Sequence, residues 1–565
     1  MNAESAYLFR HALLRDAAYQ LQLPGDRARL HGLAFEAIEA LAGGRPPEPA
    51  PLDAVDAPPF RPHAADVFAL ELAEHTRLAL AGAEAEGRTE RSRALRSAHV
   101  LYLRRAAEDS EKRSRWEAAL QLWQRHSEIV PGVRQGESLR RAGEVARQAG
   151  QPQIAEPLYE RALAIHREAG DRRCEGVALG NLASLNQVTG RVELAERRYV
   201  QALGIHREVC NRRSEGVSLG NLANLYVETG RVAQAERTYE QALAIHREVG
   251  NRLFEGAALG NLAILYQESG RVEQAERTYE RALEIHREVG DRRPEGVALG
   301  NLAILQQETG RVEQAERTHE QALTIHREVG NRQSEGSALG NLASLYEESG
   351  RVELAERTYD HALAILREVG GRRIEGAALG NLANLYQESG RADLAERTYA
   401  QALAIHREVR DRATEGATLG NLASLYERTG RVELAERTFE QALAIHREVG
   451  NRRFEGIALG NLANRYRITE RVALARRTFE QALKILGKVG DRRSECRLRC
   501  EFSLLLLASG RVKSAREKWC HGAEELRSLG SRELEGLIRC MREACSKAGV
   551  LPLDEASSRT PPSIR

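Results

Sequence analysis

The sequence predicts an all-α protein, a solenoid built from stacked helical hairpins. The string Leu-Gly-Asn-Leu-Ala recurs every 40 residues without slippage, and self-similarity at a fixed period is typical of a repeat architecture. A second constant stretch, of the type Ala-Glu-Arg-Thr-Tyr-Glu-Gln-Ala-Leu-Ala-Ile-His-Arg-Glu-Val-Gly, lies between the copies. Weaker copies at 131–170 and 491–530 keep the same frame, so we expect ten units over 131–530. The glycines of the first string are Gly180, Gly220, Gly260, Gly300, Gly340, Gly380, Gly420 and Gly460.

Each unit is expected to contain two helices, as the unit at 211–250 illustrates. Gly230 and Gly250 end the two helices, because glycine readily adopts the left-handed conformation found after a helix C-terminus. A single hairpin cannot bury the apolar stripes of both helices, so neighbouring hairpins must stack. The stripe of the first helix is Leu219, Leu222, Ala223 and Tyr226, and that of the second is Val232, Ala235, Tyr239, Ala242, Leu243 and His246.

These positions resemble the tetratricopeptide (TPR) pattern, lengthened to 40 residues. The run Gly220 to Tyr226 is most similar to the long repeats of G-protein-signalling modulators and less closely to those of kinesin light chains. The resemblance implies a right-handed superhelix that binds a protein or an extended peptide, with asparagines of the inner helices in contact with the peptide. The matching residues are Leu222-Ala223, Tyr226, Gly230, Ala235, Tyr239 and Ala242-Leu243.

The two ends of the chain depart from the repeat. Residues 1–42 resemble the segment after the ATPase core of bacterial STAND-type and LuxR-type regulators, through the motifs Phe9-Arg10-His11, Arg15 to Tyr19 and Arg27 to His31. Residues 66–130, with Trp116, Ala119 and Trp123, continue that resemblance as a degenerate TPR-like region. Residues 43–65 hold seven of the 15 prolines and are predicted to be a linker. We expect a capping helix at 531–549 and a disordered tail at 550–565. No G-x-x-x-x-G-K-[ST] phosphate loop occurs, so ATP binding is not carried over to this chain.

Composition excludes several classes of protein. Lys and Arg total 83 against 81 Asp and Glu, and a net charge of +2 argues against a strongly basic nucleic-acid binder. The start has no basic and apolar signal pattern, and the apolar run Leu504 to Ala508 is too short to span a bilayer. Seven cysteines without regular spacing suit a reducing compartment. We therefore expect a soluble cytoplasmic protein with no cofactor.

Three candidate chemical sites are each better explained by structure. Gly216 to Gly220 fits G-x-S-x-G, but Ser218 falls inside a predicted helix, and a nucleophile elbow needs a strand-to-helix turn. The late cysteines lack zinc-finger spacing and are expected to be buried small residues. A histidine recurs on the apolar stripe of the second helix, but Leu366 and Leu486 take its place in two units, which favours packing over metal binding. The histidines are His166, His206, His246, His286, His326, His406 and His446, and the cysteines are Cys496, Cys500, Cys520, Cys540 and Cys545.

The face of the first helix opposite its apolar stripe is the candidate binding surface. Glycine costs about 0.5–1 kcal/mol relative to alanine inside a helix, so either a neighbouring helix or a ligand backbone must approach there. Asparagine carries a donor and an acceptor and can pair either with a peptide backbone or with the next repeat. A row of glutamates predicts a Lys- or Arg-bearing partner or, equally, a solvated surface. The candidate residues are Gly220, Asn221, Asn224, Glu228, Gly260, Asn261, Glu268, Gly300, Asn301, Glu308, Gly340, Asn341, Glu348, Gly380, Asn381, Asn384, Glu388 and Asn421.

The sequence thus predicts a non-catalytic scaffold or sensor module in bacterial signalling that holds a peptide or protein segment in its groove. The first alternative is the detached regulatory half of a STAND-type ATPase or transcription regulator whose ATPase is a separate chain. The second alternative, an enzyme, is disfavoured because the departures from the repeat lie mainly at the ends. No nucleic-acid, membrane or metal partner is expected.

Overall fold

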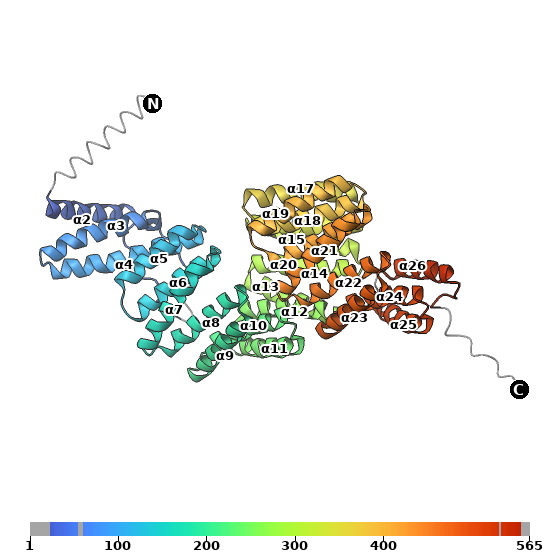
Figure 1. Cartoon of the computed structure of the whole chain (residues 1–565). Coiled ribbons are helices and arrows are strands. Elements are labelled where there is room, and N and C mark those ends of the chain that lie inside the picture. The colour runs from blue at the N-terminus through green and yellow to red at the C-terminus, as the bar shows by residue number, and fades with distance from the viewer. Residues whose placement is uncertain (1–22, 53, 55–59, 530–532, 555–565) are drawn as a thin grey trace, which may run out of the picture. The chain divides into compact units, whose positions relative to one another are not determined.

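The computed structural model describes residues 23–52, 54, 60–529 and 533–554, and in these residues all regular secondary structure is helical (Figure 1). The chain divides into two compact units, Met1–Phe254 and Glu255–Arg565. Helical hairpins stack in each unit, which confirms the predicted all-α solenoid fold. None of the described helices has the length and apolar content needed to cross a membrane.

Unit 1 begins with helices outside the repeat and continues with the first hairpins. The motifs predicted before residue 23 lie outside the described residues. The helices of unit 1 are α2 (Pro24–Leu41), the 3-10 helix η1 (Ala64–Phe68), α3 (Ala69–Ala85), α4 (Thr89–Lys112), α5 (Trp116–Ile129), α6 (Val133–Gln148), α7 (Pro152–Glu168), α8 (Arg172–Val188), α9 (Val192–Glu208), α10 (Arg212–Glu228) and α11 (Val232–Glu248).

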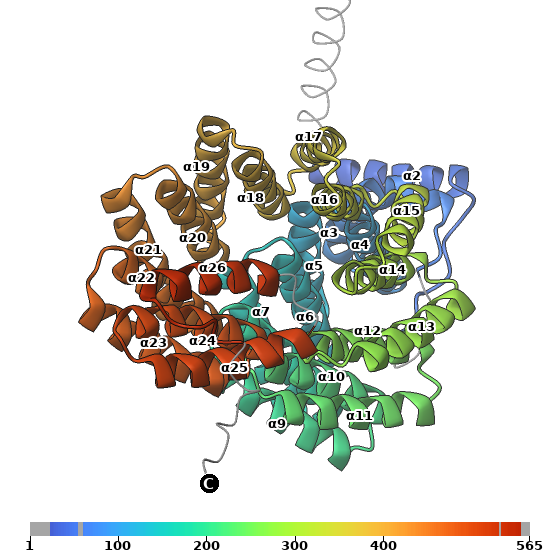
Figure 2. The same ribbon diagram turned by 90° about the vertical axis from the view of Figure 1, so that its right-hand side faces the viewer.

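Unit 2 continues the hairpins, which follow one another from green to red in Figure 2. The boundary between the units falls near the start of α12. The helices are α12 (Arg252–Glu268), α13 (Val272–Val289), α14 (Arg292–Glu308), α15 (Val312–Glu328), α16 (Arg332–Glu348), α17 (Val352–Glu368), α18 (Arg372–Glu388), α19 (Ala392–Glu408), α20 (Arg412–Arg428), α21 (Val432–Glu448), α22 (Arg452–Ile468), α23 (Val472–Val489), α24 (Arg492–Ala508), α25 (Val512–Ser528) and α26 (Glu533–Ala548).

Local sequence explains where each hairpin turns and how it packs. Gly230 has φ +72°, so it supplies the left-handed turn between α10 and α11. The Asn211 side chain accepts a hydrogen bond from the backbone N–H of Ser214 and caps α10. The small residues Ala223 and Ala242 are fully buried, as the sequence predicts for closely packed helices.

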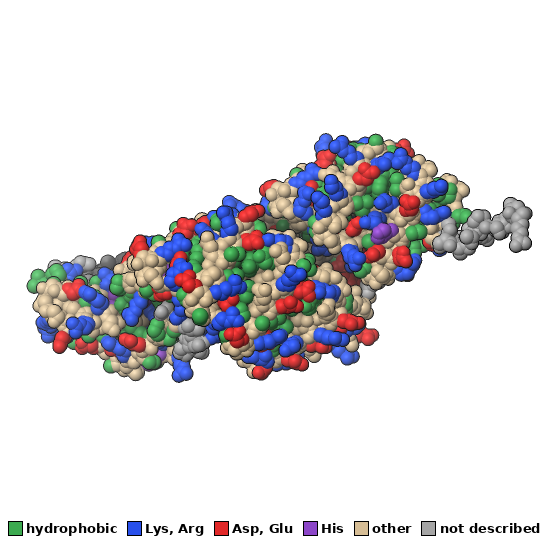
Figure 3. Space-filling view, turned by 90° about the horizontal axis from the view of Figure 1, so that it is seen from below, with side chains coloured by type: hydrophobic (Ala, Val, Ile, Leu, Met, Phe, Trp, Pro, Cys, Tyr) green, Lys and Arg blue, Asp and Glu red, His purple; other side chains and the backbone are tan. Residues whose placement is uncertain are grey.

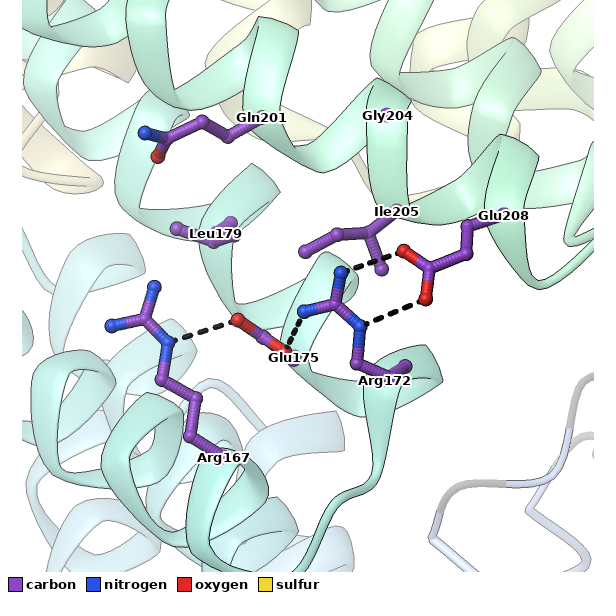
Figure 4. Close-up of a pocket in the computed structure, with 8 residues that line it drawn as sticks. All are labelled: Arg167, Arg172, Glu175, Leu179, Gln201, Gly204, Ile205 and Glu208. Atoms are coloured by element: carbon purple, nitrogen blue, oxygen red, sulfur yellow. Dashed lines mark hydrogen bonds and ion pairs between the residues drawn. The ribbon is translucent and has the colours of Figure 1, made fainter.

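Within each unit, an arginine–glutamate ladder joins most hairpins to the next on the side shown in Figure 4. Glu175 is 5% exposed and accepts hydrogen bonds from Arg167 Nε at 2.9 Å and Arg172 Nη1 at 2.5 Å. Arg172 also donates through Nη2 to Glu208 of the second helix at 2.7 Å. The ladder therefore ties three successive helices, α7, α8 and α9, by side chains that the repeat conserves at a spacing of 40 residues.

The segments flanking the hairpins are packed against them. Arg105 of α4 donates to Asp66 Oδ1 at 2.6 Å and to the Arg61 carbonyl at 3.0 Å, which anchors the end of the proline-rich segment. At the other end, α26 buries Met541 against α24. Leu553 is 1% exposed, so residues 550–554 belong to the packed structure.

Candidate functional site

The first helices of unit 2 present a continuous face of small and polar residues, here called the groove face. Successive first helices α14, α16, α18 and α20 contact one another, which lines up equivalent residues of neighbouring repeats. A Cβ added at Gly300 would meet no heavy atom within 4 Å, and the same holds for Gly220, Gly260, Gly340, Gly380 and Gly420. The alternative that a neighbouring helix needs these glycines is therefore wrong. Gly460 differs, because a Cβ there would lie 2.7 Å from Leu498.

The asparagines that follow these glycines divide into two groups. Asn421 donates to Asn384 Oδ1 of the preceding repeat at 3.2 Å, so this pair makes the inter-repeat hydrogen bond that is one of the two sequence-based readings. Asn384 also accepts a hydrogen bond from Tyr399 at 2.5 Å, as Asn224 does from Tyr239. By contrast, six of the asparagines that follow a repeat glycine make no side-chain hydrogen bond to the described residues and keep their amide groups available: Asn181, Asn221, Asn301, Asn341, Asn381 and Asn461.

The predicted acidic row follows one turn later and is exposed. Its carboxylates are paired with amides of the preceding repeat: Gln267 donates to Glu308 at 2.9 Å and Gln307 donates to Glu348 at 2.8 Å. Gln187 and Glu228 make the same contact in unit 1 at 2.8 Å. The row is thus partly an inter-repeat connection, which the sequence analysis did not foresee.

One repeat breaks this pairing and creates an acidic pocket. Glu347 stands where Gln267 and Gln307 stand in the preceding repeats, so a carboxylate rather than an amide faces Glu388. The pocket has a volume of about 430 Å³ on the groove face of α16, α18 and α20. It is lined by Ser344, Glu347, Glu348, Asn381, Asn384, Gln387, Glu388, Asn421 and Ser424. The sequence analysis named five of these nine residues and missed Ser344, Glu347, Gln387 and Ser424.

The acidic pocket changes the protonation of Glu347. Partial burial and the neighbouring charge of Glu388 raise the pKa of Glu347 to about 7, although Tyr359 donates a hydrogen bond to its Oε2 at 3.2 Å. Glu348 on the same helix adds further negative charge. None of the described residues that line the pocket is a lysine or an arginine, so a positively charged group would relieve the repulsion between its carboxylates.

The repeated histidines lie in the packed core, where the sequence places them. All seven are at most 4% exposed, and burial lowers the pKa of His206 to about 4. A Cβ at Gly296 would lie 2.7 Å from Cε1 of His326, and a Cβ at Gly336 would lie equally close to Leu366. The glycine that a second helix approaches is therefore this one, four residues before the groove glycine.

The other candidate sites from the sequence carry no chemistry in the described residues. Ser218 is 5% exposed within α10, so G-x-S-x-G forms no nucleophile elbow. Cys496, Cys500 and Cys545 are buried, as expected, and burial raises the pKa of the Cys500 thiol to about 12. The expectation of burial is wrong for Cys520 of α25 and Cys540 of α26, which are exposed.

A second pocket, of about 460 Å³, lies on the arginine–glutamate ladder (Figure 4). Its charged groups already bond one another, and Gly204 lines it where most other repeats carry a larger side chain. This pocket is therefore a space between side chains of the ladder that are already paired, and its charged groups are not available to a ligand. On the face seen in Figure 3, acidic and basic side chains are interspersed, in keeping with the near-neutral net charge.

Comparisons with known proteins agree with this architecture. The profile described as "Tetratricopeptide repeat" matches residues 174–248, 254–328, 334–408 and 414–488, more than half of the chain. No curated protein matches the sequence.

Several solved structures are similar to parts of the chain. BtubC (BKLC) from P. vanneervenii is 25% identical over 43% of this chain and 94% of its own, with a TM-score of 0.32. A Rap protein complexed with Competence and Sporulation Factor is 14% identical over 62% of this chain and 99% of its own, with a TM-score of 0.44. A Podosopora anserina putative kinesin light chain with nearly identical TPR-like repeats is 24% identical over 34% and 95%, with a TM-score of 0.28.

Proposed function

Because the chain belongs to the tetratricopeptide repeat family, we propose that it is a non-catalytic scaffold whose groove face holds an extended segment of a protein or peptide. The observation that carries this proposal is the open row of glycines beside asparagines with available amides. A helix gives up stability at each such glycine, and the space over Gly300 and its equivalents is free for a ligand backbone. The amides of Asn301, Asn341 and Asn381 supply the donors and acceptors that a backbone needs.

The acidic pocket specifies the side chain that this segment carries. Glu347, Glu348 and Glu388 lie together on the groove face, and burial, together with the charges of Glu388 and Glu348, raises the pKa of Glu347. A Lys or Arg side chain placed between them gains charge-assisted hydrogen bonds. We therefore propose that the bound segment is basic where it passes α16 and α18.

The proposal predicts the outcome of a selection experiment. A library of extended peptides is selected on the purified full chain, and the affinity of the selected peptide is measured by fluorescence anisotropy. We expect Lys- or Arg-bearing peptides. We expect the triple variant Asn301→Ala, Asn341→Ala, Asn381→Ala to bind them about tenfold to 1,000-fold more weakly, since each of the three lost hydrogen bonds contributes about 0.5–1.5 kcal/mol.

The matched control is Glu280→Gln with Glu320→Gln, which changes exposed residues of the second helices α13 and α15. This control should bind like the wild type. The triple variant should stay folded by circular dichroism, because alanine is a better helix former than asparagine. Equal affinity of the folded triple variant and the wild type would contradict the groove proposal.

The raised pKa of Glu347 makes binding of a basic peptide depend on pH. Above pH 7 Glu347 is ionised and attracts the cation, whereas below pH 7 it takes up a proton and the attraction is lost. We expect the affinity for the peptide to fall about threefold to tenfold between pH 8 and pH 6. This loss is no larger than the free energy that corresponds to a shift of one pKa unit. Protonation also relieves the repulsion from Glu388, so this loss does not come from unfolding of the pocket. Glu347→Gln should bind weakly at both pH values, and an unchanged pH profile in that variant would contradict the assignment.

The finer role in bacterial signalling, and the alternative of a regulatory half working with a separate ATPase, remain predictions. They rest on the resemblance of 1–42 and 66–130, and residues 1–22 lie outside the described residues. The profile match begins only at residue 174. A phosphate-loop protein that copurifies with the full chain would support the ATPase alternative.

A further inference from the structure

Three buried side chains of unit 1 form a cluster that the groove does not involve. Glu137 of α6, His166 of α7 and Cys174 of α8 are 3%, 0% and 4% exposed. One potential ligand atom from each, a carboxylate oxygen, a ring nitrogen and the thiol sulfur, lies within 4.8 Å of the other two. The cluster therefore joins three successive helices through groups that are all able to bind a metal ion.

The combination of Glu, His and Cys occurs at only one of the boundaries between repeats in the sequence. At the later boundaries the position of Glu137 is taken by Val, Ala, Ser or Ile, and the position of Cys174 by Ser, Phe, Pro, Ile or Thr. Packing between α6 and α8 therefore needs neither a carboxylate nor a thiol. A buried carboxylate is unfavourable unless it is paired, and Arg140 is the partner that allows Glu137 to stand beside a histidine and a cysteine.

The protein contacts leave coordinating capacity in this cluster. Arg140 Nε donates to both carboxylate oxygens of Glu137, at 3.1 and 3.0 Å, but each oxygen has a second lone pair. His166 Nε2 lies 3.3 Å from Glu137 Oε1, yet neither ring nitrogen of His166 has a hydrogen-bonding partner among the described residues. Gly136 leaves the room for this ring, since a Cβ there would lie 2.5 Å from its Cε1.

We propose that Glu137, His166 and Cys174 form a zinc site. Zn²⁺ binds sulfur, nitrogen and carboxylate oxygen together, and this mixed set excludes the oxygen-preferring Mg²⁺ and Ca²⁺ as the favoured ions. On binding, the Cys174 thiol releases its proton to solvent, and the thiolate and the Glu137 carboxylate balance the two charges of the ion. Arg140 donates hydrogen bonds to the carboxylate and orients it, as the partners of ligand side chains do in known metal sites.

This site would fasten the first hairpin to the run of repeats. Cys174 lies in the first turn of α8, where the helix dipole favours negative charge, and the other two ligands come from α6 and α7. A bound ion stabilises the folded state by mass action, because the unfolded chain does not bring these three groups together. The effect should be local to α6–α8.

Cobalt spectroscopy on the full chain tests the site. Chelator-treated protein is titrated with Co²⁺, and the thiolate-to-cobalt charge-transfer band is recorded before Zn²⁺ is added as competitor. We expect one equivalent of Co²⁺ with this band, which Zn²⁺ abolishes. In Cys174→Ser we expect the band to vanish and affinity to fall about 100-fold or more, since even the loss of a residue that only orients a ligand costs about 10–100-fold.

Controls keep this test independent of folding and of the other thiols. Serine stands at the Cys174 position in three later repeats (Ser214, Ser334 and Ser494), so Cys174→Ser should fold. Cys210→Ser removes an exposed thiol and should keep the band. Hydrogen exchange of α6–α8 should slow on addition of Zn²⁺ in Cys210→Ser but not in Cys174→Ser. A wild type without the band, or a Cys174→Ser variant that retains it, would overturn the proposal.

Discussion

Replacing Gly296 with alanine is expected to destabilise its hairpin by about 1–3 kcal/mol, whereas the same replacement at Gly300 should stabilise it by about 0.5–1 kcal/mol. A Cβ at Gly296 would lie 2.7 Å from Cε1 and 3.0 Å from Nδ1 of His326, whose ring is 4% exposed. The edge of the ring must therefore move within a packed core. At Gly300 the added methyl meets nothing within 4 Å and improves helix propensity.

Urea denaturation followed by circular dichroism, with hydrogen exchange of α14 and α15, measures both effects. Local exchange is needed because repeats of a solenoid unfold in part independently. The double variant Gly296→Ala, His326→Ala should recover part of the loss, since the smaller side chain makes room for the methyl. If both single alanine variants shift stability in the same direction, the difference between the two glycines is not steric.

These two glycines show how far the sequence determines the fold. The period of 40 residues and the apolar stripes were sufficient to predict stacked helical hairpins. They were not sufficient to separate Gly296 from Gly300, because residues four apart lie on nearly the same side of a helix. Only the direction in which the second helix crosses decides which glycine it approaches. The sequence analysis therefore recognised that a missing side chain mattered and left its cause open.

The acidic pocket needed information of a different kind. Glu347 and Glu388 are 41 residues apart, and the same separation joins Gln307 to Glu348. That contact depends on how far one repeat is shifted along the next, which a periodic pattern does not reveal. A signal was nevertheless present, since Glu347 stands where most other repeats between residues 180 and 430 carry glutamine, with Val227 and Glu427 as the other departures. The cluster of Glu137, His166 and Cys174 could not be predicted from the sequence for a similar reason. These residues are spaced irregularly and come together only because three helices stack.

A second large effect is expected at Glu335, which ties α15 to α16. Glu335 is 3% exposed and accepts hydrogen bonds from Arg327 Nε at 2.9 Å and Arg332 Nη1 at 2.6 Å. Glu335→Gln should destabilise the fold at pH 7 by about 2 kcal/mol, because hydrogen bonds to charged groups contribute about 1.5–3 kcal/mol and both arginines can partly return to water. Denaturation of wild type and variant at several pH values measures the loss.

The pH dependence of the destabilisation in Glu335→Gln shows whether it comes from the lost charge or from altered packing. Burial by itself raises the pKa of Glu335, but the hydrogen bonds from Arg327 and Arg332 outweigh it and lower the pKa below 4.5. The contribution of Glu335 is therefore present above its ordinary pKa and disappears as the pH falls through the lowered folded value, because the unfolded chain binds the proton first. The stability difference between Glu335→Gln and the wild type should therefore disappear over that pH range.

Glu368→Gln, which removes the exposed partner of Arg332, should change stability by less than about 1 kcal/mol at every pH. A pH-independent loss in Glu335→Gln, or an equal loss in Glu368→Gln, would mean that the ladder acts through packing rather than through its buried charge.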